Sequence, residues 1–214
     1  MILSGISEQT PDFIITRTQG EQLTLEELFD ICQGLELRQA KLYASFALHL
    51  GDYDERIARF WERMSTEEWQ HYILVDFGRA VCIETFGKDT VISEADTDKT
   101  TSPIVPFPHI SIQDITDALD AHESQVESGR ISLDEAFEIA IEIEGSESDT
   151  IYLYLLSIMR QAIQASDQPY LMSRIVQVEK DMVSHVDGLV QATLKFSKDP
   201  SLNRKAHRLK EEHI

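Results

Sequence analysis

The sequence predicts an all-α protein, built as a four-helix bundle in which one long connection crosses between the second and third long helices. Three observations predict this fold. Four long segments carry apolar residues at the i, i+3, i+4, i+7 spacing of a single helix face. Sequences that cap helix N-termini precede several of these segments. Tight turns separate the first segment from the second and the third from the fourth, and no strand-like alternation competes.

The first two long helices are expected to pack antiparallel. A capping box formed by Thr24 and Glu27 begins a helix over residues 24–50. A similar motif at residues 52–55 begins the second helix, which ends before Gly87. Because so few residues join the two helices, the second must fold back along the first.

The connection to the third long helix is expected to be structured in part. Residues 88–110 contain three prolines and many polar residues, whereas residues 111–128 predict a short helix. Residues 88–128 therefore form a crossover insert. Two further long helices are expected over residues 132–165 and 169–196, joined by another tight turn.

The bundle accordingly spans residues 23–196. Residues 1–22 show no strong periodicity, and we expect them to lie on the surface as an arm. Residues 197–214 form a polar tail, expected to be frayed or docked.

Composition excludes several functions. The chain has 38 acidic and 19 basic residues, a net charge of −19, so it lacks the basic face of a nucleic-acid binder and is disfavoured on anionic membranes. It contains no apolar run of about 18 residues that would span a membrane, and its start does not resemble a signal peptide. The two cysteines, Cys32 and Cys82, form no C-x-x-C pair, which excludes rubredoxin-type iron sites. We expect reduced thiols in a cytoplasmic protein.

Carboxylates stand at mid-length on or beside the apolar stripes of the predicted helices. Glu36 falls on the first stripe, and Glu68 and His71 continue the second. Isolated buried charges are costly, so these side chains need partners. Taken singly, each would be a rim carboxylate or a core histidine, but all four helices share the feature. The third and fourth helices contribute Glu144, Glu147 and Glu179. Carboxylates with a Glu-x-x-His pair are the ligand pattern of di-metal bundles.

Three motifs resemble the di-iron domain of rubrerythrins, within the ferritin-like superfamily. Glu36 precedes Tyr43 by seven residues, and Glu68-x-x-His71 follows on the next helix. The third helix has a Glu-x-x-Glu pair, Glu144 and Glu147, followed by a tyrosine, Tyr152. The resemblance covers residues 24–50, 54–86 and 130–196.

This resemblance implies a carboxylate-bridged site for two iron ions, with manganese or zinc as alternatives. It implies that Tyr43 and Tyr152 lie beside the ligands and hydrogen-bond to carboxylates. Peroxide or dioxygen would be the small-molecule oxidant, in rubrerythrin-like peroxide reduction or ferroxidase-type iron oxidation. The implied metal ligands are Glu36, Glu68, His71, Glu144, Glu147 and Glu179.

The sequence departs from the family in three places. Gln39 replaces an alanine, and no rubredoxin module follows the bundle, so the electron donor is unknown. Met182 stands where the family has a histidine, and His185 lies one turn further, about 4.5 Å along the helix axis. We expect His185 to be too distant for that ligand position, and therefore predict one tight metal position at His71 and a weaker one facing Met182.

Two other functions remain open. The missing histidine and redox module are also consistent with a helical scaffold or binding module that kept the bundle and lost its metal chemistry. Iron storage in a hollow shell is a third, less favoured hypothesis, because the crossover insert would have to fit a cage interface. A homodimer is expected only because symmetric dimers are the commonest oligomers.

Overall fold

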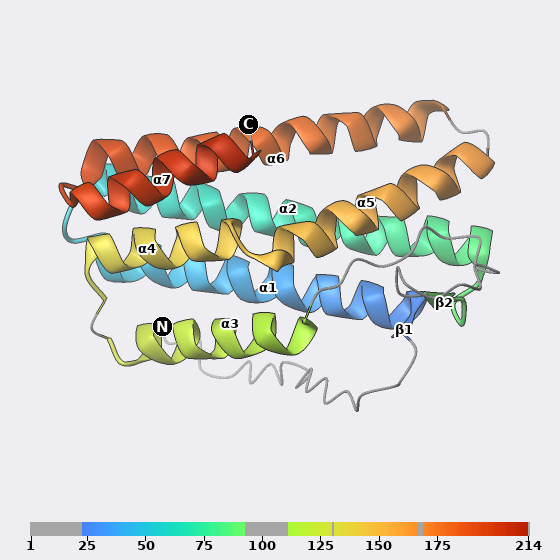
Figure 1. The fold of residues 1–214 in the computed structure, drawn as a ribbon, viewed down its shortest axis with the longest axis horizontal. Helices are drawn as coiled ribbons and strands as arrows, with labels where there is room; N and C mark the ends of the chain where they lie inside the picture. The colour runs from blue at the N-terminus through green and yellow to red at the C-terminus, as the bar shows by residue number, and fades with distance from the viewer. Residues whose placement is uncertain (1–22, 93–110, 130, 167–168, 214) are drawn as a thin grey trace, which may run out of the picture.

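The computed structural model describes residues 23–92, 111–129, 131–166 and 169–213 (Figure 1). The described chain is all-α apart from one short β-ribbon, in agreement with the predicted class. Predictions for the arm at residues 1–22, and for residues 93–110 of the crossover, fall outside the described residues. The elements are β1 Leu23–Thr24, α1 Leu25–Leu50, α2 Glu55–Phe86, β2 Val91–Ile92, α3 Ile112–Glu127, α4 Leu133–Glu144, α5 Glu147–Ala165, α6 Pro169–Phe196 and α7 Pro200–His213.

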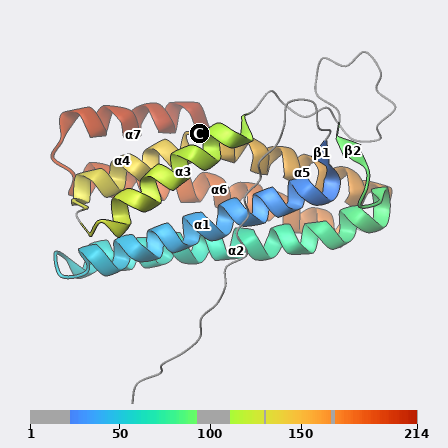
Figure 2. The same ribbon diagram turned by 90° about the horizontal axis from the view of Figure 1, so that it is seen from below.

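Helices α1 and α2 form a long antiparallel hairpin, as predicted. Thr24 accepts a hydrogen bond from the Glu27 backbone N–H, and the Glu27 carboxylate accepts one from the Thr24 backbone, which completes the capping box. Asp54 caps α2 by accepting from the Arg56 N–H. The helices turn within four residues after Leu50, so they lie side by side along their lengths (Figures 1 and 2).

A two-stranded ribbon ties the start of α1 to the chain beyond α2. Leu23 pairs with Ile92 and Thr24 with Val91, in antiparallel register. The sequence predicted no strand here, because two residues are too few to show an alternating pattern. The ribbon closes the open end of the hairpin.

The predicted short helix of the crossover is present as α3, and it packs on α1. Its apolar face buries Ile115, Leu119 and Val126. Arg38 of α1 donates to Glu123 of α3 through Nε and Nη2, both at 2.9 Å. This crossover helix therefore covers the side of α1 that faces away from α2 (Figure 2).

The third predicted helix is broken in two, which corrects the prediction of one continuous helix over residues 132–165. α4 ends at Glu144, where the Gly145 N–H donates to the Ile141 carbonyl, and α5 begins at Glu147. A Cβ on Gly145 would lie 3.0 Å from the Ile141 oxygen and 3.3 Å from Leu209 of α7. Glycine thus permits the close approach of α7 at the break.

The predicted polar tail is a helix, α7, which folds back on α4 and α6 (Figure 1). Leu202, Ala206 and Leu209 bury one face, at the i, i+4, i+7 spacing. Lys205 holds the other side of the contact by donating to Glu138 of α4 at 2.6 Å. This apolar stripe is short and lies among charged residues, so the sequence did not reveal the helix.

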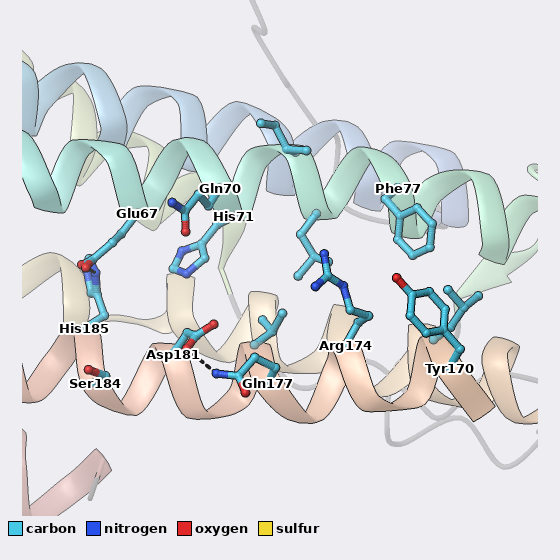
Figure 3. A pocket seen from close by; sticks show the side chains of 14 residues that line it. Glu67, Gln70, His71, Phe77, Tyr170, Arg174, Gln177, Asp181, Ser184 and His185 are labelled. Atoms are coloured by element: carbon cyan, nitrogen blue, oxygen red, sulfur yellow. Dashed lines mark hydrogen bonds and ion pairs between the residues drawn. The ribbon is translucent and has the colours of Figure 1, made fainter. Parts of the chain in front are cut away.

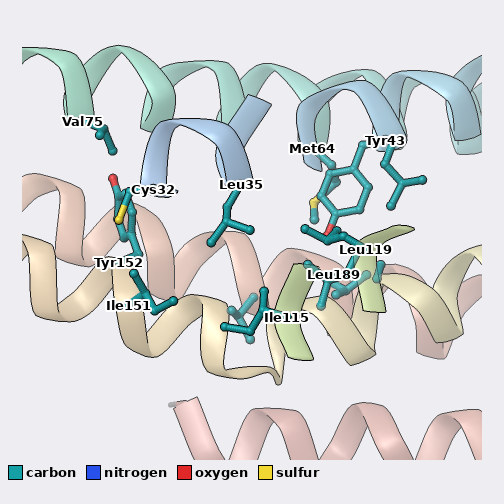
Figure 4. Close-up of a cluster of buried hydrophobic side chains, with 14 of the residues drawn as sticks. Cys32, Leu35, Tyr43, Met64, Val75, Ile115, Leu119, Ile151, Tyr152 and Leu189 are labelled. Atoms are coloured by element: carbon teal, nitrogen blue, oxygen red, sulfur yellow. The ribbon is translucent and has the colours of Figure 1, made fainter. Parts of the chain in front are cut away.

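The core lies between the helices. Aromatic rings are concentrated in one part of it. Figure 4 shows apolar side chains from several helices, among them Leu35, Ile115 and Ile151, converging in this interior. Five rings pack with centroids 4.7–5.9 Å apart. These are Tyr43, Phe46, Phe60, Trp61 and Phe137. Within the described residues, no helix has the length and hydrophobicity of a membrane span.

Candidate metal centre

Five side chains with metal-ligating groups meet in the interior, beside the aromatic rings. They come from α1, α2, α4 and α6. Four of them lie well inside their helices, and Glu144 is the last residue of α4. All are buried, except that His71 retains 13% of its side-chain exposure. The five are Glu36, Glu68, His71, Glu144 and His185.

The first group belongs to the α1–α2 hairpin alone. Glu36 on α1 faces Glu68 and His71 on α2. His71 Nδ1 donates to Glu68 Oε2 at 3.0 Å and lies 3.4 Å from Glu36 Oε2. Helical spacing explains this meeting, because residues three apart on α2 share a face and that face points at α1.

The second group joins α2 to α4 and α6. His185 Nε2 donates to Glu144 Oε1 at 3.1 Å and lies 3.0 Å from Glu68 Oε1. Its other nitrogen, Nδ1, donates to Glu67 Oε2 at 2.8 Å, which fixes the ring. Glu67 is about a third exposed and was not predicted as a site residue.

Glu68 belongs to both groups and lies between the two histidines. One of its carboxylate oxygens faces His71 and the other faces His185, whose rings are 5.8 Å apart between centroids. Within each group, the potential ligand atoms all lie within 4.8 Å of one another. A carboxylate in this position could bridge two ions, each with one imidazole and one further carboxylate.

Two buried oxygens in the cluster make no hydrogen bond with any described residue. They are Glu36 Oε2 and Glu68 Oε1, which lie within ion-pair distance of a histidine but without hydrogen-bond geometry. A void of about 10 Å³, close to the space that one water occupies, lies among these side chains. Unsatisfied buried carboxylate oxygens are costly, so this donor set fits a cation.

The histidines and carboxylates shift one another's pKa values. Burial raises the pKa of Glu36 to about 8, although His71 opposes that rise. Burial alone would lower the pKa of His71, but the nearby carboxylates of Glu36 and Glu68 outweigh burial and raise it to about 10. Burial would likewise raise the pKa of Glu68, yet the charges of His185 and His71 hold it below its usual range. The pKa of His185 is raised, because Glu144 and Glu68 outweigh its burial.

The two predicted tyrosines lie beside the cluster. The Tyr43 hydroxyl donates to Glu144 Oε1 at 2.6 Å, within the buried interior. The Tyr152 ring is 5.2 Å from the His71 ring and borders the same void. Tyr43 therefore orients the carboxylate that His185 also contacts.

The structure does not bring every predicted ligand into the cluster. Glu179 of α6 pairs instead with Arg160 of α5 and is more than a third exposed. It lies six residues before His185, about 9 Å along the helix axis, and a guanidinium faces it at that level. The side chain of Glu147, the first residue of α5, lies outside the described side chains.

The prediction that His185 lies too far away to be a ligand is wrong. Its distance along the helix axis from Met182 does not decide whether it is a ligand, because the relevant level is set by the carboxylates on the other helices. Met182 borders the same void, but His185 is the residue that contacts Glu68 and Glu144. Its place on the stripe with Val178, Met182 and Leu189 was the available signal. Each Glu/His group contains an imidazole, so the geometry does not support Met182 as a cause of unequal metal binding.

The cluster is reachable from outside through a cavity of about 730 Å³ between α2 and α6 (Figure 3). His71 and His185 both line this cavity. We compared the chain with family models, with curated proteins and with solved structures. None of the three comparisons found a match.

Proposed function

We propose that this protein is a carboxylate-bridged di-metal protein of the ferritin-like, rubrerythrin-type kind, with two iron ions at the centre. One observation carries the proposal: two Glu/His groups share the buried carboxylate of Glu68. A four-helix bundle formed by α1, α2, α4 with α5, and α6 is the matching architecture. Manganese or zinc would suit the same oxygen and nitrogen donors.

Charge supports two cations at this position. Three buried carboxylates, Glu36, Glu68 and Glu144, converge on two imidazoles. With divalent ions bound, the histidines would be neutral ligands, and the metal charge would replace the protons that they otherwise hold. Buried carboxylates without such compensation are strongly unfavourable.

The chemistry would be that of a non-haem di-iron oxidoreductase. Two ferrous ions, when bound, can together supply two electrons to peroxide or dioxygen. The chain's own residues prepare the site. Tyr43 holds Glu144 by a hydrogen bond, Glu67 holds the His185 ring, and the aromatic rings beside Tyr43 exclude water. Such orienting contacts fix ligand geometry.

The test is metal content together with the rate of ferrous oxidation. Protein loaded anaerobically with ferrous iron should bind two equivalents, and anomalous scattering at the iron edge should place both beside Glu68. Glu68→Ala should lose both equivalents and the oxidation activity. Glu62→Ala, an exposed carboxylate on the same helix, is the matched control and should behave as wild type. A wild type that takes up no iron, manganese or zinc under these conditions would refute the proposal.

A scaffold that has lost metal chemistry is the second candidate. It is supported by the ion pairs of His185, which donates to Glu67 and Glu144 and so balances charge without a metal. This function predicts that a chelator leaves the melting temperature unchanged. Metal-dependent stabilisation that disappears in Glu68→Ala would exclude it.

A further inference from the structure

The cavity between α2 and α6 is larger than peroxide or dioxygen requires. Its volume of about 730 Å³ lies within the range of pockets that hold drug-sized organic molecules. It extends from the outer turns of both helices to His71 and His185 (Figure 3). An organic molecule bound along it would therefore end beside the candidate metal centre.

Apolar side chains form the walls of the outer part of this cavity. Ile73 is 63% exposed and Tyr170 is 71% exposed, so the walls are open to solvent in the unliganded chain. Large apolar side chains exposed together mark binding sites more often than chance. The apolar lining comprises Ile73, Leu74, Phe77, Leu171 and Val178, with the Tyr170 ring beside them.

Two charged side chains of the cavity, Asp181 and Arg174, have no counter-charge among the described residues. Glu67 accepts from His185, and Asp181 accepts from Gln177 Nε2 at 2.8 Å. Among the residues that the structure describes, none forms an ion pair or hydrogen bond with Arg174. Figure 3 shows the Arg174 side chain directed into the space between the helices. A guanidinium beside apolar walls is suited to a carboxylate, which it can bind with two parallel hydrogen bonds.

We propose that the cavity binds an amphipathic monocarboxylate, with its carboxylate on Arg174 and its hydrocarbon tail directed at His71 and His185. Arg174 lies eleven residues before His185 on α6, about 16 Å along the axis. An extended hydrocarbon advances about 1.3 Å along its axis for each C–C bond. Roughly a dozen carbons therefore span this distance. Binding of the carboxylate does not depend on the proposed function. Only the further step, in which the metal centre acts on the tail, rests on that function.

Binding is tested by calorimetry on the full chain, with a chelator present. Dodecanoate is the probe. Dodecanol, which lacks the charge, and acetate, which lacks the tail, are the comparison compounds. Dodecanoate should bind more tightly than either. Arg174→Gln should weaken dodecanoate roughly ten-fold and leave dodecanol unchanged. Lys180→Gln, an exposed cation on the same helix outside the cavity, should have no effect. Equal affinity of dodecanoate for wild type and Arg174→Gln would overturn the proposal.

A second variant tests the direction of the tail. Val178→Trp fills the cavity one turn beyond Arg174, towards His185, and should reduce dodecanoate affinity while leaving hexanoate affinity unchanged. An unchanged affinity for dodecanoate would show that the tail lies elsewhere. Because the chelator removes metals, these results are independent of the metal centre. Metal uptake without dodecanoate binding would refute only this inference, and the reverse would refute only the proposed function.

Discussion

At the scale of single residues, the orientation of His185 decides whether the second Glu/His group, like the first, contains an imidazole. Its Nε2 faces Glu68 and Glu144, while its Nδ1 is anchored by Glu67. Met182, one turn earlier on the same helix, only borders the void. Each of the two Glu/His groups therefore contains an imidazole.

His185→Ala and Met182→Leu should have opposite outcomes in a metal titration. His185→Ala removes the imidazole of the second group, so it should bind only the first equivalent with near wild-type affinity. Loss of one such ligand should weaken the second equivalent by about ten-fold or more. Met182→Leu keeps an apolar side chain of similar size and should bind both equivalents. If Met182→Leu loses the second equivalent and His185→Ala does not, the assignment of His185 is wrong.

At the scale of elements, Gly78 sets how closely α5 approaches α2. The neighbour that lies against this position is Met159 of α5. A Cβ on Gly78 would lie 2.4 Å from the Met159 sulfur, which is buried. Glycine in a helix interior is normally unfavourable by about 1 kcal/mol, so packing explains its presence here.

Gly78→Leu should destabilise the protein by about 2–3 kcal/mol, because the added side chain must displace Met159 from a packed core. Combining it with Met159→Ala should recover part of that loss, which a double-mutant cycle of urea unfolding measures. Ala80→Leu, an exposed site on the same helix, is the control and should change the free energy of unfolding little. Additive effects of Gly78→Leu and Met159→Ala would contradict direct contact between these positions.

The elements also show what a sequence can and cannot predict. Capping boxes at Thr24 and Ser132 located helix starts correctly, because a cap is a local hydrogen-bond pattern. The break at Gly145 was missed, because the apolar stripe continues through it and the approach of Leu209 is a contact between distant segments. The ribbon and α7 were missed because short or charge-rich segments carry weak periodicity.

The candidate centre follows the same division. Glu36, Glu68, His71 and Glu144 were predicted, and the structure brings them together. The spacing along one helix is fixed by its period, so Glu68 and His71 could be paired from sequence. The level at which α6 faces the other helices depends on packing, which is why His185 was placed outside the cluster.

At the scale of the whole molecule, the protonation of the cluster should control stability when no metal is bound. The folded state favours the protonated forms of Glu36, with a pKa near 8 against 4.5, and His71, with a pKa near 10 against 6.5. Their contributions are complete below pH 4.5 and 6.5 and are lost as pH rises through 8 and 10. Glu68 acts oppositely, since its lowered pKa favours folding above pH 4.5.

Metal-free protein should therefore gain its greatest stability from the cluster near pH 4.5, and lose several kcal/mol of it by about pH 10. Urea unfolding in the presence of a chelator measures this. With zinc added, the trend should reverse across pH 6–8, since the metal competes with protons for the same atoms. In Glu68→Ala, the pH dependence of stability should be the same with and without zinc. A free energy of unfolding of the metal-free wild type that stays constant from pH 5 to about 10 would contradict the assigned pKa shifts of Glu36 and His71.

The two halves of the centre also differ in how much of the chain must be assembled before each exists. Glu36, Glu68 and His71 all belong to the α1–α2 hairpin, whose contacts join neighbouring segments. The half containing Glu144 and His185 needs α4 and α6, far along the chain. Local contacts form early in folding and distant ones late. During synthesis, the hairpin would therefore bring three potential ligands together while α6 is still being made. Under the proposed function, the first ion would enter a protein that is only half folded.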